Sequence, residues 1–260
     1  MGETRRGFLK KAGYAALGLG CGLPLFGAAA LGERRARPRT PAKQLGLVID
    51  VRKCMDGRVA RAAIEACHSE HNVPFISDPL EEVKWVWTEP FERAFPDQAH
   101  GRAPEFLREN PVLVLCNHCS DPPCVRVCPT KATWKRRSDG VVMMDMHRCI
   151  GCRYCMAACP YGARSFNWRD PRAHLTDVRA EYPTRTAGVV EKCTFCDERL
   201  REGREPACVE AVRCVPGADG AMTFGDVSDP ESEASRLLRA KFTICRRVEL
   251  GTGPNVFYIV

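Results

Sequence analysis

Residues 149–160 of this chain read Cys-Ile-Gly-Cys-Arg-Tyr-Cys-Met-Ala-Ala-Cys-Pro. This C-x2-C-x2-C-x3-C-P spacing is one by which thiolates hold [4Fe–4S] clusters, because Cys149, Cys152 and Cys155 allow one loop to wrap around a cluster. Cys159 follows roughly one helical turn later, and the proline after it ends a short helix. In paired motifs of this kind the last cysteine binds the neighbouring cluster.

Three further groups of cysteines accompany this third motif. The second has a C-x2-C-x4-C-x3-C-P spacing, and the fourth opens with a C-x2-C pair. Zinc is the alternative metal, because C-x2-C pairs also hold zinc. Zinc sites need neither the third cysteine nor the C-x3-C-P tail, so the pattern favours iron–sulfur clusters. The groups are Cys116, Cys119, Cys124 and Cys128 in the second, Cys193, Cys196, Cys208 and Cys214 in the fourth, and Cys54 and Cys67 in the first.

The cysteine content also limits the class of protein. Sixteen cysteines among 260 residues are too many for an ordinary cytosolic enzyme and too clustered for an ordinary disulfide scaffold. The length allows one large domain or two small ones. The formal net charge is +7, which we interpret as compensation for anionic clusters and as a docking face. No nucleic-acid partner is expected.

Residues 1–31 are predicted to be a twin-arginine export signal, because Arg5 and Arg6 precede a moderately apolar, glycine-containing stretch. The small residues 27–30 offer a cleavage site. One alternative is a transmembrane anchor, since a stretch of about 20 apolar residues spans a bilayer. Another is lipidation at Cys21, although its surroundings are a poor lipoprotein motif. A basic, proline-rich linker is expected at residues 32–44.

The predicted export route agrees with the cysteine motifs. An iron–sulfur protein receives its clusters in the reducing cytoplasm and must cross the membrane already folded. Twin-arginine export carries folded cargo. We therefore expect a periplasmic protein, either peripheral to the inner membrane or anchored at it.

The body of the sequence, residues 45–260, is expected to be an α+β domain in which a short strand, a cysteine loop and a short helix recur. Residues 72–111 lack cysteine, and their aromatic side chains are expected to pack a core insertion. These aromatic residues are Trp85, Trp87, Phe91 and Phe95. The expected strands are Leu45–Val51, Val112–Leu115, Val141–Asp145, Gly188–Glu191 and Ala221–Phe224, and the expected helices are Ala62–Ser69, Cys152–Ala158, Cys196–Arg201 and Pro230–Ala240.

The sequence resembles the periplasmic ferredoxin-type iron–sulfur subunits that accompany quinone-interacting membrane proteins and molybdopterin enzymes. The resemblance covers nearly all of residues 45–260 and rests on segments such as 128–133, 192–199 and 250–258. Residues 159–172 and 66–74 are most similar to the O subunit of the dissimilatory-sulfite-reductase-associated transmembrane redox complex. The resemblance implies duplicated bacterial-ferredoxin-like units with inserted loops and a C-terminal extension. The first and fourth motifs form one unit, and the second and third form the other.

The resemblance also implies that the motifs exchange their last cysteines. Each predicted cluster then receives three ligands from one motif and one ligand from its partner motif. The implied ligand sets are Cys116, Cys119, Cys124 and Cys159 for one cluster, Cys149, Cys152, Cys155 and Cys128 for the next, and Cys193, Cys196, Cys208 and Cys67 for a third.

A fourth cluster would need cysteines that this protein lacks. In the first motif the expected positions hold Gly57, Ala60 and Ala63, and in the fourth motif Val212 stands where the final cysteine is expected. Both departures affect one site, so we predict three clusters and a lost fourth. Two alternatives stay open, a fourth cluster with a non-cysteine ligand or a disulfide. The cysteines left for this vestigial site are Cys54, Cys214 and Cys245.

Two other groups of residues allow a plain and a functional interpretation. His68 and His71 are substitute cluster ligands in one interpretation, and helix-end residues that make surface hydrogen bonds in the favoured one. The run 135–137, Lys-Arg-Arg, is expected to be a solvated turn, with a docking patch as the alternative.

These observations predict electron transfer between a quinone site in a polytopic membrane subunit and another redox subunit in sulfur metabolism. That subunit would be a c-type cytochrome. The alternative is a molybdopterin subunit, in an oxidoreductase of the polysulfide, tetrathionate or nitrite type. A non-redox metal or disulfide scaffold is the alternative of another class. No catalytic residues are predicted, because no nucleophile–base pair is evident and cysteines fill the assigned cluster ligands.

Overall fold

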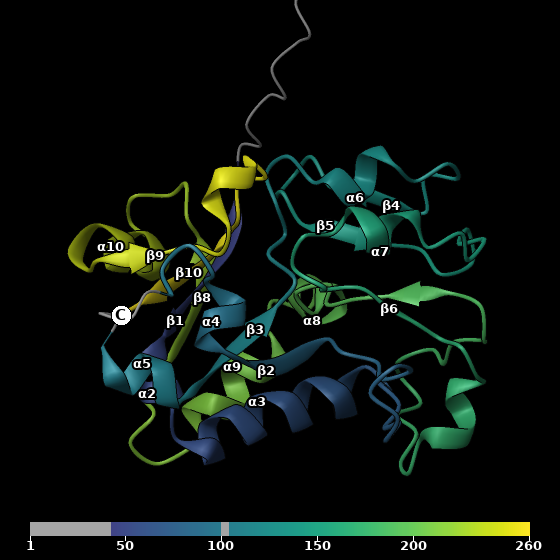
Figure 1. Ribbon diagram of the computed structural model, residues 1–260, viewed down its shortest axis with the longest axis horizontal. Helices are drawn as coiled ribbons and strands as arrows, with labels where there is room; N and C mark the ends of the chain where they lie inside the picture. Colours follow the sequence, from purple (N-terminus) through teal and green to yellow (C-terminus); the bar gives the residue numbers. More distant parts are fainter. Residues whose placement is uncertain (1–42, 100–103) are drawn as a thin grey trace, which may run out of the picture. The chain divides into compact units, whose positions relative to one another are not determined.

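A computed structural model describes residues 43–99 and 104–260 (Figure 1). The predicted export signal and almost all of the predicted linker therefore lie outside the described residues. Within the described ranges, no helix has both the length and the apolar character needed to cross a membrane.

A four-stranded mixed sheet forms one part of the fold. Its strand order is β8-β1-β10-β9, with β1 parallel to β10 and antiparallel to β8. Residues 45–49 of β1 are all buried, as expected for a strand that is covered on both faces. The strands predicted at 45–51 and 221–224 are confirmed with small shifts, whereas the two C-terminal strands were not predicted. The bounds are β1 Leu45–Asp50, β8 Met222–Asp226, β9 Thr243–Ile244 and β10 Val256–Ile259.

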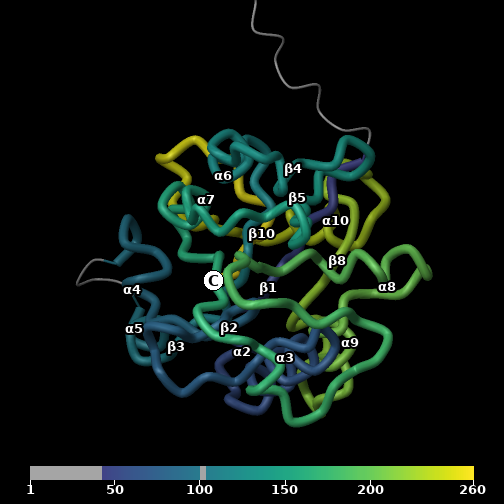
Figure 2. The backbone as a smooth tube through the Cα atoms, turned by 90° about the vertical axis from the view of Figure 1, so that its right-hand side faces the viewer, coloured from purple at the N-terminus to yellow at the C-terminus, as the bar shows by residue number. Residues whose placement is uncertain are grey.

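Helix α3 (Gly57–Glu70) packs on α9 (Ala207–Arg213), and both views show the two helices side by side (Figures 1 and 2). The helix predicted at 62–69 begins five residues earlier in the structure. The reason is Asp56, whose side chain accepts a hydrogen bond from the Arg58 backbone N–H at 2.9 Å and so caps the helix. The buried side chains of α3 recur at helical spacing.

The cysteine-free segment contributes a two-stranded sheet, β2 (Val86–Pro90) paired with β3 (Pro111–Leu115). The short helices α4 (Phe91–Ala94) and α5 (Glu105–Glu109) lie between these strands in the sequence. All four of its aromatic side chains named above are at least nine-tenths buried. The predicted core role of this segment is therefore confirmed.

A second, smaller hydrophobic core lies beside the main one. It contains Val142 and Met144 of β5 and Val190 of β7, together with Cys124 and Cys155. A strand followed by a cysteine loop and a short helix occurs three times in this part of the protein, as expected. The elements are α6 (Pro123–Arg126), β4 (Thr133–Lys135), β5 (Val142–Met144), α7 (Tyr154–Ala158), β6 (Ser165–Phe166), β7 (Val190–Glu191) and α8 (Asp197–Arg201).

The remaining helices are short and lie outside these repeats. They are α2 (Val51–Cys54), α10 (Glu233–Ala240), and the 3-10 helices at Pro171–His174 and Val248–Leu250. The helix predicted at 230–240 is confirmed from Glu233 onward, because the Ser232 side chain caps it by accepting from the Ser235 N–H at 3.1 Å.

The basic run 135–137 is not simply a solvated turn. Lys135 ends β4, and its ammonium group donates to the Ser120 carbonyl at 3.0 Å. Arg136 forms ion pairs with Asp139, at 2.6 Å, and with Asp197. Only Arg137 is exposed, so this part of the sequence mainly fastens the β4–β5 hairpin to α8.

Candidate iron–sulfur sites

Four cysteines from two motifs line one small cavity beside α7 and β5, which we call the outer site. Three come from the third motif and the fourth is the last cysteine of the second motif, as the exchanged arrangement requires. Cys152 is the one exposed member. The four cysteines of the outer site are Cys128, Cys149, Cys152 and Cys155.

Backbone geometry shapes the outer site. Gly151 has φ +69°, and a Cβ atom there would lie 2.5 Å from the carbonyl oxygen of Gly188. Only glycine therefore suits the turn between Cys149 and Cys152. The thiol of Cys149 accepts a hydrogen bond from the backbone N–H of Val190 at 3.5 Å, so β7 holds one edge of the loop.

The surroundings of Cys128 favour the thiolate form of its side chain. Burial alone would raise its pKa, but hydrogen bonds from the Thr133 backbone, the Thr130 side chain and the Ala132 backbone together lower it. Hydrogen bonds to a charged form favour that form. Thiolates, not thiols, bind metals, so this environment suits a ligand.

A second set of thiols forms the middle site. Burial raises the pKa of Cys119 to about 12, with the thiol of Cys116 as the next cause and those of Cys124 and Cys159 as further ones. Burial and then Cys116 raise the pKa of Cys159 as well. The structure therefore brings together the four cysteines predicted for this cluster, three from the second motif and one from the third.

The third set, the inner site, draws one cysteine from α3 and three from the fourth motif. Burial raises the pKa of Cys67 well above its usual value, and the neighbouring thiols of Cys193, Cys196 and Cys208 raise it further. Backbone N–H groups approach two of these sulfurs, with Phe195 N 3.4 Å from Cys193 Sγ and Ala207 N 3.3 Å from Cys196 Sγ. All four cysteines are buried.

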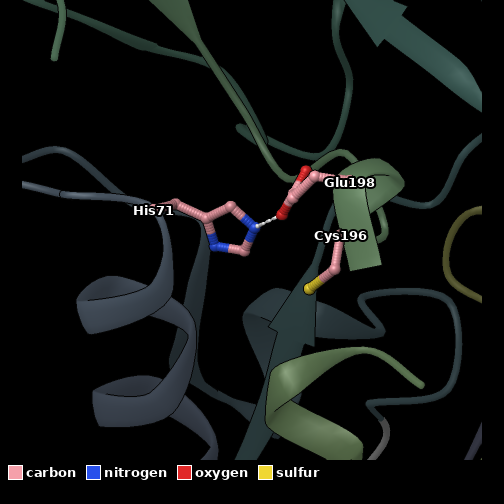
Figure 3. Close-up of side chains that lie close together, drawn as sticks. All are labelled: His71, Cys196 and Glu198. Atoms are coloured by element: carbon pink, nitrogen blue, oxygen red, sulfur yellow. Dashed lines mark hydrogen bonds and ion pairs between the residues drawn. The ribbon is translucent and has the colours of Figure 1, made fainter. Parts of the chain in front are cut away.

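His71 lies beside the inner site rather than on the surface, so its predicted surface role is wrong (Figure 3). It is 1% exposed because it stacks on Trp85 with ring centroids 4.6 Å apart. Nδ1 lies 2.7 Å from the Cys67 carbonyl oxygen, and Nε2 lies 2.7 Å from Glu198 Oε1. His71, Glu198 and Cys196 have ligand atoms within 4.8 Å of one another. Both ring nitrogens of His71 face protein acceptors. His71 therefore packs beside the inner site and is not one of its four cysteine ligands.

His68 is half-buried. Burial lowers its pKa to about 4, and its side chain lines a cavity of about 740 Å³ along α3 together with Cys54. It does not join the four thiols of the inner site.

The predicted vestigial site carries packed side chains on α3 and α9, although Cys54, Gly57 and Ala60 also line the cavity of about 740 Å³. Ala63 of α3 is fully buried and Ala60 nearly so, and the two lie on the face that also carries Cys67. Val212 is 1% exposed on α9, which packs against this face. Apolar side chains thus occupy positions where a fourth cluster with cysteine ligands would require thiols.

The three leftover cysteines do not form a common site. Cys54 is buried, and its thiol lies 3.5 Å from the Ala221 carbonyl oxygen. Cys214 is exposed at the end of α9. Burial raises the pKa of Cys245 to about 11. Among the described cysteines none forms a disulfide, so the disulfide alternative is not found in this structure.

The surroundings of the sites fit a buried anionic group. Lys192 is fully buried, donates to the Cys193 carbonyl at 2.6 Å, and has no carboxylate partner among the described residues. His118 accepts from the Val142 N–H at 3.1 Å, which leaves its Nε2 as the donor, and that buried atom has no protein partner within the described part of the protein. A cluster held by thiolates supplies negative charge and sulfur acceptors. The thiols themselves need a bound metal to ionise, since burial raises the pKa of most of them.

The sequence interpretation missed these supporting residues. Lys192 directly precedes a cysteine, which is a signal that was available. His118 lies between two cysteines of the second motif and was equally visible. Glu198 gave no signal, because only the fold places it against His71.

Comparison with known proteins identifies the class. Residues 112–227 match the family model of the 4Fe-4S dicluster domain. Residues 112–227 therefore form a ferredoxin-type 4Fe-4S dicluster domain, in a protein of mixed helix and strand content.

Full-length relatives refine this assignment. The sequence is 42% identical to the Hdr-like menaquinol oxidoreductase iron-sulfur subunit 1 of Archaeoglobus fulgidus, over 83% of each protein. It is 36% identical to the menaquinone reductase iron-sulfur cluster-binding subunit of Nitratidesulfovibrio vulgaris, over 82% of this sequence and 88% of the relative. It is 35% identical to the B subunit of Wolinella succinogenes polysulfide reductase, over 84% and 95%. The protein belongs to the family of 4Fe-4S iron–sulfur subunits of membrane redox complexes. Its role is electron transfer rather than catalysis.

Proposed function

We propose that this protein carries electrons through three [4Fe–4S] clusters held at the outer, middle and inner sites. Each cluster supplies a one-electron carrier, and the protein supplies its position and surroundings. The observation that carries the proposal is that four-cysteine groups assemble from two motifs each, in the combinations expected from the exchanged arrangement. The exchange supports a pair of duplicated ferredoxin-like units.

Electrostatic effects between thiols of different sites support the order outer, middle, inner. Cys124 of the middle site is among the causes that raise the pKa of Cys155 of the outer site, after burial. Cys116 of the middle site is the first cause after burial that raises the pKa of Cys193 of the inner site. The middle site therefore neighbours both others, and electrons pass along the row.

The proposed partners are a polytopic quinone-interacting membrane subunit and a second redox subunit, in sulfur metabolism. The names of the Archaeoglobus and Nitratidesulfovibrio relatives include menaquinol and menaquinone, which supports the quinone partner. The narrower proposal is the O subunit of the dissimilatory-sulfite-reductase-associated complex, with a c-type cytochrome as the second subunit. Its basis is the pair of segments 66–74 and 159–172.

The proposed location is the periplasm, reached in a folded state by the twin-arginine route. The support is the pair Arg5 and Arg6 ahead of an apolar stretch, combined with cysteine motifs that need clusters inserted before export.

A second candidate is the same module in a molybdopterin oxidoreductase. The similarity to the polysulfide reductase subunit favours it. In that case the second redox subunit contains molybdenum and the sequence of clusters is unchanged.

Purification of the native complex tests these proposals. Subunits would be identified by mass spectrometry, and iron, haem and molybdenum would be measured. Rapid mixing with a menaquinol analogue should bleach the visible iron–sulfur absorption. Haem without molybdenum supports the first candidate, and molybdenum supports the second. A colourless protein, or clusters that no quinol or partner subunit reduces, would contradict electron transfer.

A further inference from the structure

Arg164 is a buried arginine between the middle and outer sites. It is 4% exposed and lies in the segment that leads from Cys159 into β6. Its Nη2 donates to Thr133 Oγ1 at 2.8 Å, and its Nη1 lies 3.7 Å from the sulfur of Met144. Both contacts come from the β4–β5 hairpin, so the guanidinium is held in the smaller hydrophobic core.

This guanidinium has no carboxylate partner within 4.0 Å among residues 43–99 and 104–260. Two other deeply buried arginines do have one, since Arg185 pairs with Glu191, and Arg199 pairs with Glu70 at 3.2 Å, whereas the buried Arg246 donates to the Ala94 carbonyl. Burying an unpaired charge costs several kcal/mol even after relaxation of the protein. A cation that is retained here therefore needs another source of negative charge.

The nearest candidates are sulfurs of two different sites. The two residues that Arg164 contacts, Thr133 and Met144, line the outer-site cavity with Cys155, and Met144 packs in the smaller hydrophobic core with both Cys155 and Cys124 of the middle site. Although burial lowers the pKa of Arg164, the thiols of Cys124, Cys155 and Cys116 outweigh this effect and raise it. One guanidinium thus faces one cysteine from each of two neighbouring clusters. Its planar, multi-donor shape allows it to contact both at once.

We propose that Arg164 is a shared positive partner of the middle and outer clusters that raises the reduction potential of both. This inference rests on the proposed function, because it requires clusters at both sites. Reduction of either cluster adds one electron and neither makes nor breaks a bond. The added negative charge is stabilised by the fixed cation, and weak screening in the interior preserves the effect.

The inner site provides an internal reference. The residues that hold Arg164, Thr133 and Met144, do not belong to this site, and a different cation, Lys192, donates to the Cys193 carbonyl there at 2.6 Å. Removal of the Arg164 charge should therefore change the midpoint potentials of the outer and middle clusters and leave the midpoint potential of the inner cluster unchanged. A general loosening of the fold would move all three.

The test is a redox titration with dithionite of the anaerobically purified holoprotein, followed by electron paramagnetic resonance. Arg164→Met should lower the equilibrium constant for one-electron reduction of the outer and middle clusters by about tenfold each, or about 59 mV. Arg164→Lys should restore most of this loss. Arg137→Met is the matched control, because it removes an exposed arginine from the β4–β5 hairpin that holds Arg164, where water screens the charge.

Several outcomes would overturn the inference. They are unchanged potentials in Arg164→Met, equal shifts of all three clusters, a shift confined to one cluster, an Arg164→Lys protein that behaves like Arg164→Met, and an equal shift in the Arg137→Met control. If Arg164→Met loses iron, Thr133→Val provides the second test. This substitution removes the hydroxyl that positions the guanidinium. It should lower the potentials of the outer and middle clusters by less than Arg164→Met does. Unchanged potentials in Thr133→Val would also contradict the inference. Failure of the proposed function itself would be seen in the unaltered protein, as missing cluster signals or no reduction by quinol.

Discussion

The imidazole ring of His118 stacks on the ring of Phe195, with centroids 3.6 Å apart. His118 lies in the cysteine loop of the middle site, and Phe195 lies between two cysteines of the inner site. The contact therefore joins two cluster loops that are distant in the sequence. Phe195 also meets Phe224 of β8 edge-to-face at 5.2 Å, so the same ring ties both loops to the four-stranded sheet.

Removal of this ring should destabilise the fold at the junction. Phe195→Ala is expected to cost about 3–5 kcal/mol, because it deletes a large buried side chain and leaves a cavity. The measurement is the thermal unfolding midpoint of the holoprotein under anaerobic conditions. Phe242→Ala is the control, since Phe242 is 76% exposed and its loss should leave the midpoint nearly unchanged. Equal effects of the two substitutions would contradict the proposed junction.

Exchange of cysteines between motifs predicts a specific pattern of damage. Cys128→Ala and Cys155→Ala should remove the same electron paramagnetic resonance signal, because both residues line the outer site. The signals of the other two sites should persist. Cys214→Ala should leave all signals intact, since Cys214 is exposed and apart from the three sites. Loss of the middle-site signal in Cys128→Ala, with the outer signal kept, would refute the exchange.

The number of clusters is open to direct analysis. Three [4Fe–4S] clusters correspond to about twelve irons per protein molecule. Cys54→Ala should leave the iron content unchanged, because its thiol contacts a carbonyl oxygen rather than other thiols. An iron content near sixteen, or a fall by about four irons in Cys54→Ala, would show that the first motif still holds a cluster.

The packed α3–α9 interface should not tolerate added volume. Ala63→Leu is expected to lower the free energy of unfolding by about 1–3 kcal/mol, because Ala63 is fully buried and faces α9. Arg61→Leu, on the exposed side of the same helix, is the matched control. Chemical denaturation of the two variants under anaerobic conditions measures the difference. A stable Ala63→Leu protein would indicate spare room at the former site.

Export can be tested apart from cluster assembly. Joint Arg5→Lys and Arg6→Lys substitutions should keep the protein in the cytoplasm with its clusters intact, because the twin-arginine route requires the arginine pair. Cell fractionation combined with iron analysis measures both properties. Undiminished periplasmic protein in this variant would refute the proposed route.

The sequence by itself determined the chemistry of the sites. Thiol spacing is a local property, and it predicted the cysteine motifs and the positions where alanine or valine stands in place of an expected cysteine, while the family resemblance implied which cysteines share a site. It also placed the strands and helices next to the cysteines, since those elements are short and bounded by glycine, proline and capping residues. The aromatic core of residues 72–111 followed from side-chain type alone.

Only the tertiary structure decided how these groups are surrounded. The position of His71 at a helix end predicted a surface residue. In the structure, Trp85 and Glu198, which are distant in the sequence, lie against its ring. The strands β9 and β10 exist through pairing with each other and with β1 rather than through their own pattern. Arg164 is an ordinary arginine in the sequence. Its isolation from carboxylates and its position between two sets of thiols depend on burial and long-range packing, which spacing along the polypeptide does not encode.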